Sequence, residues 1–171
     1  MYFAGEWDKM PSLPCSMYLA AACVCNEKIF VIKNNIQYLT KGSQHWTQLQ
    51  VALPYEQGLD HCAALGGSIY ILASHADLLI SFDINSETVT VKKTPATNCT
   101  QLSTWRSSHL SFVREIDNQD DFESSFEVLL YEPKTEISQV VGRVTGTDMS
   151  IHDILEIVQY PNFRKWNTLI D

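Results

Sequence analysis

Basic residues are scarce in this chain. Its 171 residues include 12 Lys and Arg against 20 Asp and Glu, which gives a formal net charge of −8. Binding to DNA, RNA or an anionic membrane surface requires concentrated positive charge. We therefore expect no nucleic-acid partner and no membrane partner, and an acidic domain of this kind mildly favours basic protein segments.

Long apolar runs and catalytic signatures are also missing. No run approaches the roughly 18 apolar residues of a membrane span, and Glu6, Asp8 and Lys9 interrupt the start of the chain, where an export signal would lie. The sequence contains no Gly-x-Ser-x-Gly nucleophile turn and no phosphate-binding Gly-x-x-x-x-Gly-Lys-Ser/Thr loop. We predict a protein that is not an enzyme.

The cysteines give no sign of a disulfide framework or a metal centre. They are odd in number and scattered, at Cys15, Cys23, Cys25, Cys62 and Cys99. Cys23 and Cys25 cannot pair without bending their strand, and the adjacent His61 and Cys62 point to opposite faces of a strand. We predict reduced thiols, no metal, no cofactor and a cytoplasmic location.

One stretch, residues 61–72, has the clearest local signal. Small apolar residues lead into Gly66-Gly67, and an apolar run from Ile69 to Leu72 follows. Paired glycines close two-residue hairpins because they reach positive φ without steric cost. The second strand is apolar on both faces, so we expect it in the middle of a sheet.

The same pattern occurs about forty positions earlier. Residues 20–32 form two short apolar runs, with Asn26-Glu27 in place of the glycines. Tryptophan followed by Leu-Pro also recurs, at Trp7 and Trp46. A period near forty made of short strands is typical of repeat architectures.

This order of elements resembles the kelch repeat, with Phe82-Asp83 in the place of its Tyr-Asp element. The resemblance covers about residues 7–94 and is fainter to about 141. Lys33-Asn34 and Ala73-Ser74 stand where kelch repeats carry Gly-Gly. Kelch repeats build four-stranded blades of β-propellers, so the resemblance implies an all-β, partial kelch-type β-propeller of about three blades.

The blades are expected over residues 1–147, followed by a C-terminal tail, 148–171, that is either a helix or a closing strand. The first blade spans 20–49 and the second 59–91. The third has strands at 109–113, 126–131 and 137–141, with a long acidic loop at 114–125. A six-bladed ring at this period needs on the order of 240 residues, so we expect a piece of a longer protein or an incomplete ring.

Tryptophans are predicted on outer strands, where they pack between blades: Trp7, Trp46, Trp105 and Trp166. In kelch propellers the turns after each second strand line the partner-binding face. The resemblance therefore implies binding residues at Lys33, Asn34, Asn35, Ser74, His75 and Asp77, with the start of 114–121 beside them.

The implied function is protein–protein interaction, as the substrate-recognition region of a cullin-type ubiquitin ligase adaptor. Actin association is a lower-ranked implication of the same resemblance. One alternative is a propeller enzyme or a domain that binds a sugar or a metal at its axis. Another is a non-autonomous fragment of a longer kelch protein, which would self-associate through an open blade edge.

Overall fold

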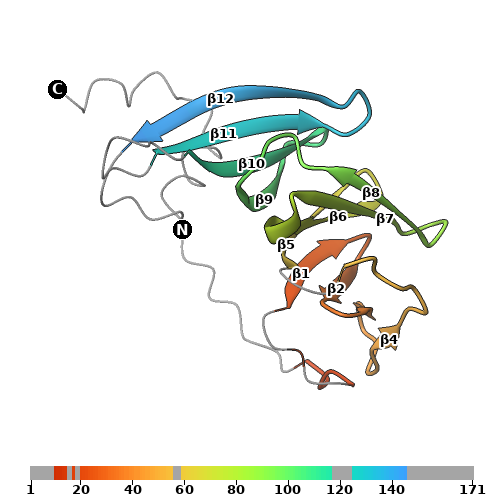
Figure 1. Ribbon diagram of the computed structural model, residues 1–171. Helices are drawn as coiled ribbons and strands as arrows, with labels where there is room; N and C mark the ends of the chain where they lie inside the picture. The colour runs from red at the N-terminus through yellow and green to blue at the C-terminus, as the bar shows by residue number, and fades with distance from the viewer. Residues whose placement is uncertain (1–9, 15–16, 18–19, 56–58, 117–124, 146–171) are drawn as a thin grey trace, which may run out of the picture.

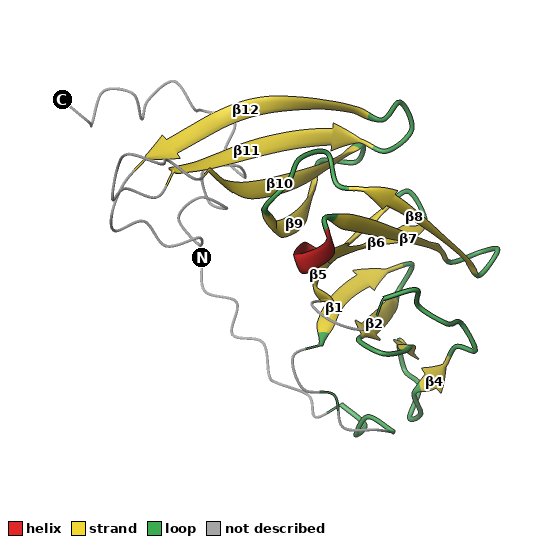
Figure 2. Ribbon diagram, viewed as in Figure 1, coloured by secondary structure: helices red, strands yellow, loops and turns green. Residues whose placement is uncertain are grey.

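The computed structural model describes residues 10–14, 17, 20–55, 59–116 and 125–145 (Figure 1). These residues form three four-stranded antiparallel sheets and a short 3₁₀ helix (Figure 2). The all-β prediction is confirmed. In this part of the chain no helix is long or apolar enough to cross a membrane.

The first sheet is a simple meander in the order β1-β2-β3-β4. Its strands are β1 (Ala21–Cys25), β2 (Lys28–Ile32), β3 (Ile36–Thr40) and β4 (Thr47–Gln48). Asn26 and Glu27 close the first hairpin with φ values of 48° and 57°. Two consecutive left-handed residues match the twist of a two-residue hairpin. Asn26 and Glu27 therefore form the turn in place of a glycine pair, as predicted.

The second sheet repeats this order. Its strands are β5 (Leu59–Leu65), β6 (Ser68–Ala73), β7 (Leu78–Asp83) and β8 (Thr88–Lys93), and the 3₁₀ helix η1 (Ser74–Ala76) joins β6 to β7. Gly66 and Gly67 have φ values of 60° and 84° and close the β5–β6 hairpin. β6 pairs with β5 on one side and β7 on the other, as its apolar sequence predicts.

The third sheet has the same order but longer strands. They are β9 (Cys99–Trp105), β10 (His109–Ile116), β11 (Ser125–Glu132) and β12 (Ile137–Thr145). The predicted loop at 114–125 is wrong at both ends, because β10 continues through Ile116 and β11 already begins at Ser125. Arg114 can lie within a strand because Glu127, directly opposite it, compensates its charge.

Two predicted tryptophan positions can be compared with the fold. Trp46 directly precedes the outer strand β4, as expected, and its Nε1 donates a hydrogen bond to the Pro11 carbonyl at 2.9 Å. Trp105 is different, because it ends the first strand, β9, and lies at the β9–β10 hairpin. Its outer-strand prediction is wrong. The predictions for Trp7, Trp166 and the tail 148–171 lie outside the described residues.

The three sheets are arranged so that their first strands are neighbours (Figure 1). β1 contacts β5, and β5 contacts β9. The Thr104 hydroxyl on β9 donates a hydrogen bond of 2.9 Å to the Ala64 carbonyl on β5, forty positions earlier in the sequence. Equivalent positions of successive repeats therefore lie side by side.

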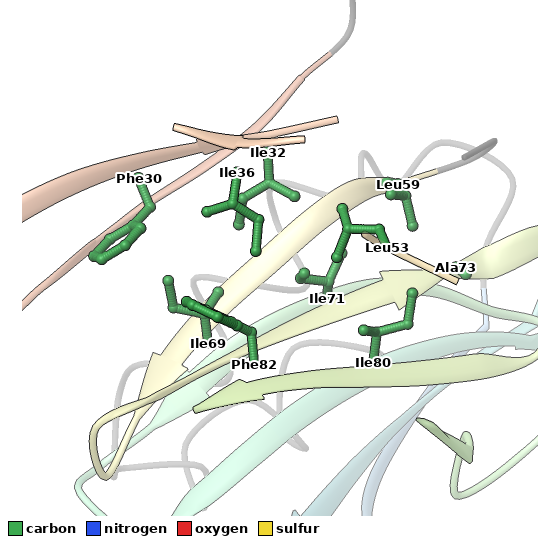
Figure 3. Packing of buried hydrophobic residues seen from close by; sticks show 10 residues of the cluster. All are labelled: Phe30, Ile32, Ile36, Leu53, Leu59, Ile69, Ile71, Ala73, Ile80 and Phe82. Atoms are coloured by element: carbon green, nitrogen blue, oxygen red, sulfur yellow. The ribbon is translucent and has the colours of Figure 1, made fainter. Parts of the chain in front are cut away.

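The second sheet contributes to two separate apolar cores. Its Ile69 and Ile71 pack with Phe30 of the first sheet (Figure 3). Leu72, next along β6, packs instead with Phe112 of the third sheet. Successive residues of a strand point to opposite faces, so the double-sided apolar sequence of β6 joins the neighbouring sheets into one structure.

Candidate functional site

The predicted binding residues lie in equivalent connections of the first two sheets. Residues 33–35 join β2 to β3, and residues 74–77 join β6 to β7. The sheets share one strand order and their first strands are adjacent, so these connections lie at the same end. We call residues 33–35 and 74–77 the turn face. The equivalent connection of the third sheet, 117–124, lies outside the described residues.

Within the first connection, one asparagine holds the turn and the other faces solvent. The Lys33 amide donates to the Asn35 carbonyl at 3.1 Å, and the Asn35 side-chain oxygen accepts a hydrogen bond of 3.1 Å from Gln37 Nε2. Asn34 is exposed. Asn34 is thus available to a partner, whereas Asn35 is engaged within the protein.

Asp77 is also engaged within the protein. It adopts a left-handed conformation, with φ 51° and ψ 41°. Its Oδ1 accepts a hydrogen bond of 3.0 Å from the Asn98 amide, and its carbonyl accepts one of 2.9 Å from the Thr94 amide. These bonds link the connection between β6 and β7 to the segment between β8 and β9. Asp77 thus helps to order the connection between the second and third sheets.

The remaining residues of the second connection differ in exposure. His75 is exposed, and Ser74 is half-buried with its carbonyl accepting a bond of 3.4 Å from the Asp77 amide. Asn34 and His75 are therefore the two predicted residues that project from equivalent positions of neighbouring sheets with exposed side chains. Both offer hydrogen-bond donors and acceptors.

A buried carboxylate lies elsewhere, on the third sheet. Glu127 is 3% exposed. It accepts hydrogen bonds from Arg114 Nε at 2.8 Å and from Arg143 Nε at 3.1 Å. The two guanidinium groups, Arg143 first and Arg114 second, hold the pKa of Glu127 below its usual value. An acid kept ionised between two arginines suits a structural role rather than proton transfer.

The sequence of β10 contains a signal for this cluster. Leu110, Phe112 and Arg114 alternate along β10, which places the arginine on the same face as two core residues. Charged residues on a core-facing position require a partner. Glu127 occupies the equivalent position on β11, directly opposite Arg114.

A thiol pair lies on the first strands. The Cys62 thiol of β5 donates a hydrogen bond to the Cys23 sulfur of β1, which lowers the pKa of Cys23 and raises that of Cys62. Burial raises the pKa of Cys25. Cys23 and Cys25 lie on one face of β1, since both lie opposite residues of the same face of β2.

An open groove of about 360 Å³ lies beside β8, with Lys92 and Lys93 on one side and Tyr131, Glu136 and Ser138 on the other. Lys92 forms an ion pair with Glu136 across the groove. The carboxylate of Glu136 raises the pKa of Lys92. One of the two lysines is thus already neutralised, which weakens the groove as an anion site.

Metal binding can be assessed over the same part of the chain. Among the described residues, no group of three or more His, Cys, Asp or Glu side chains could hold a metal ion. The acidic residues of 117–123 lie outside them. The described geometry therefore supplies exposed turns, a compensated carboxylate and a thiol pair.

No family model and no curated protein matches the chain. Among solved structures, it is similar to the extracellular domain of a hybrid two-component system of B. thetaiotaomicron, with a TM-score of 0.45, 8% identity and coverage of 70% of this chain. It is also similar to a Bacteroides uniformis protein described as a 6-phosphogluconolactonase, with a TM-score of 0.46, 12% identity and 72% coverage. The chain spans 21% and 40% of those two structures.

Proposed function

We propose that this chain is part of a kelch-like β-propeller that binds a protein partner through its turn face, without catalysis. The observation that supports this most directly is the repetition of one four-stranded meander, with equivalent first strands side by side. Radially repeated four-stranded sheets are how propellers are built. Rigid sheets of this kind hold loops in fixed positions, where binding residues concentrate.

The exposed residues of the turn face suit hydrogen bonding to a protein. Asn34 and His75 project from equivalent connections, while Asn35 and Asp77 keep those connections ordered through internal hydrogen bonds. A preordered surface reduces the entropy lost on binding. We propose a cytoplasmic setting, and a cullin-type ubiquitin ligase adaptor as the longer protein to which such a region would belong.

The test compares partners of the full chain with partners of two matched variants. Proximity labelling in cells would use the wild type, Asn34→Ala/His75→Ala, and the control Lys41→Ala/Ser107→Ala. The control residues are exposed in the β3–β4 and β9–β10 connections, at the opposite end of the sheets. Circular dichroism would first establish that all three fold alike.

We expect the first variant to lose, at least tenfold, proteins that the wild type and the control both label. Cullin subunits among the proteins labelled by the longer parent would support the adaptor assignment. Equal labelling by all three proteins would contradict binding through the turn face. Turnover of a sugar substrate by the chain would instead support the alternative of a propeller enzyme.

A further inference from the structure

Cys23 and Cys62 face one another across the boundary between the first and second sheets. Cys23 lies directly opposite Phe30 in the β1–β2 ladder, and Cys62 lies opposite Ile71 in the β5–β6 ladder. Directly opposite residues of an antiparallel pair share one face of the sheet. Phe30 and Ile71 belong to the same apolar core (Figure 3).

Both thiols consequently point into the space between the sheets, and both pack against that core. Their strands are direct neighbours, since β1 contacts β5. The two thiols therefore face the same core from neighbouring strands of the first and second sheets. Both residues are half-buried and not sealed in the interior.

The two sulfur atoms have different chemistry. The hydrogen bond from Cys62 lowers the pKa of Cys23, so Cys23 is the thiol that ionises first. The pKa of Cys62 is raised by the same bond. A thiolate is the nucleophilic form of cysteine, so the lowered pKa favours Cys23 as the attacking group and Cys62 as the resolving group.

The other described cysteines lack this arrangement. Cys25 lies two positions along the same strand, and burial raises its pKa. Cys99 is buried, its thiol donates a bond of 3.3 Å to the Ala96 carbonyl, and burial raises its pKa to about 11. A thiol that stays protonated reacts slowly with peroxides.

We propose that Cys23 and Cys62 form a peroxide-oxidisable pair that closes into a disulfide between the first and second sheets. The Cys23 thiolate attacks one oxygen of hydrogen peroxide, and the O–O bond breaks. Cys23 becomes a sulfenic acid, and the departing hydroxide takes the proton that Cys23 had lost and leaves as water.

In the second step the Cys62 sulfur attacks the Cys23 sulfur. The S–S bond forms, the S–O bond breaks, and the departing hydroxide takes the Cys62 proton and leaves as a second water. Two thiols are oxidised by two electrons in total, and one peroxide is reduced to two waters. The product joins β1 to β5 and fixes the boundary between the two sheets.

The experiment treats the full chain with hydrogen peroxide, blocks remaining thiols with a maleimide and digests with trypsin. Cys23 falls in the peptide 10–28 and Cys62 in the peptide 42–92. We expect these two peptides to become linked, and a reductant to separate them. Since 10–28 also contains Cys15 and Cys25, the same digestion is repeated on the variant Cys15→Ser/Cys25→Ser.

The link should survive in Cys15→Ser/Cys25→Ser and disappear in Cys23→Ser. In Cys62→Ser, which lacks the resolving thiol, a dimedone-type reagent should instead trap sulfenic acid on Cys23 at several times the wild-type level. Matching circular dichroism spectra show that the variants are folded. A link that persists in Cys23→Ser, or unlinked peptides in the folded wild type after peroxide, would overturn the proposal.

Discussion

The second and third sheets have the same strand order but are stabilised by different interactions. In β6 of the second sheet, Ile69, Ile71 and Leu72 are all 0% exposed. The third sheet buries Glu127 and Ser111 at 3% exposure each. Ser111 shares a hydroxyl hydrogen bond of 2.6 Å with Ser103, and Glu127 is held by two arginines. One repeat thus accommodates either an apolar or a partly polar interior.

The outer strands of the two sheets, β8 and β12, differ in the side chains that they expose. β8 carries Lys92 and Lys93 next to Val91, which is 42% exposed, whereas β12 exposes Ile137 at 65% and Val140 at 48%. Lysines on an edge discourage pairing with another chain, and exposed apolar residues permit it. A register shift near the β12 position of Val140 bends the strand locally. Of these two outer strands, β12 exposes the larger apolar surface.

Removing an apolar anchor of the second sheet should have the largest effect. Phe82 is 0% exposed and packs in the core shared with the first sheet. Phe82→Ala should lower the free energy of unfolding by about 3–5 kcal/mol, because it removes buried area and leaves a cavity. Urea unfolding measures this. Phe82→Leu, the control, should cost less than half as much, and equal losses would contradict the packing account.

Much of the second sheet could be predicted from the sequence, and the strands predicted at 109–113, 126–131 and 137–141 fall within β10, β11 and β12 of the third. The glycine pair and the continuous apolar run predicted the β5–β6 hairpin and the central place of β6. The strand β9 was not predicted, since Thr100, Gln101, Ser103 and Thr104 dilute its apolar pattern. The local pattern predicts a loop at charged Arg114, because the partner that compensates its charge lies thirteen positions away. Local patterns do not report such pairings.

Breaking the ion pairs of the third sheet should have an intermediate effect. Glu127→Gln removes the acceptor charge of two arginines and should cost about 1–3 kcal/mol, the range for hydrogen bonds to charged groups. Its two arginine partners are themselves 30% and 62% exposed, so we expect a smaller loss of stability than for a deeply buried pair.

The same variant should change the pH dependence of unfolding. The folded-state pKa of Glu127 is lowered. Its stabilisation is therefore complete above the unfolded value, about 4.3, and is lost as pH falls through the folded pKa. The difference in free energy of unfolding between wild type and Glu127→Gln should shrink as the solution is acidified. A difference that is constant or grows toward low pH would exclude this role.

A smaller loss of stability is expected when Asp77, at the connection between the second and third sheets, is replaced. Asp77→Ala removes the acceptor of the Asn98 amide and places alanine in a left-handed conformation, at a cost of about 1–2 kcal/mol. Asp77→Asn keeps an acceptor oxygen and tolerates that conformation. Thermal unfolding should give a lower midpoint for Asp77→Ala than for Asp77→Asn. Equal midpoints would contradict a stabilising role for this connection.

The smallest effect is predicted for the surface ion pair between the sheets. Lys92 and Glu136 have side chains 45% and 59% exposed. Solvent screens such pairs, and ordering two long side chains offsets the attraction. Lys92→Ala should leave the unfolding midpoint within experimental error. A clear loss of stability would mean that β8 and the β11–β12 turn are coupled more strongly than the exposure of these side chains implies.

The central claim is that the second sheet joins its neighbours into one folding unit, because β6 contributes to both cores. Calorimetry of the full chain, with its mass in solution measured by light scattering, tests this most directly. We predict a single transition whose calorimetric and van't Hoff enthalpies agree. Two separate transitions, or aggregation without a transition, would contradict the claim and favour a fragment that requires the rest of a longer protein.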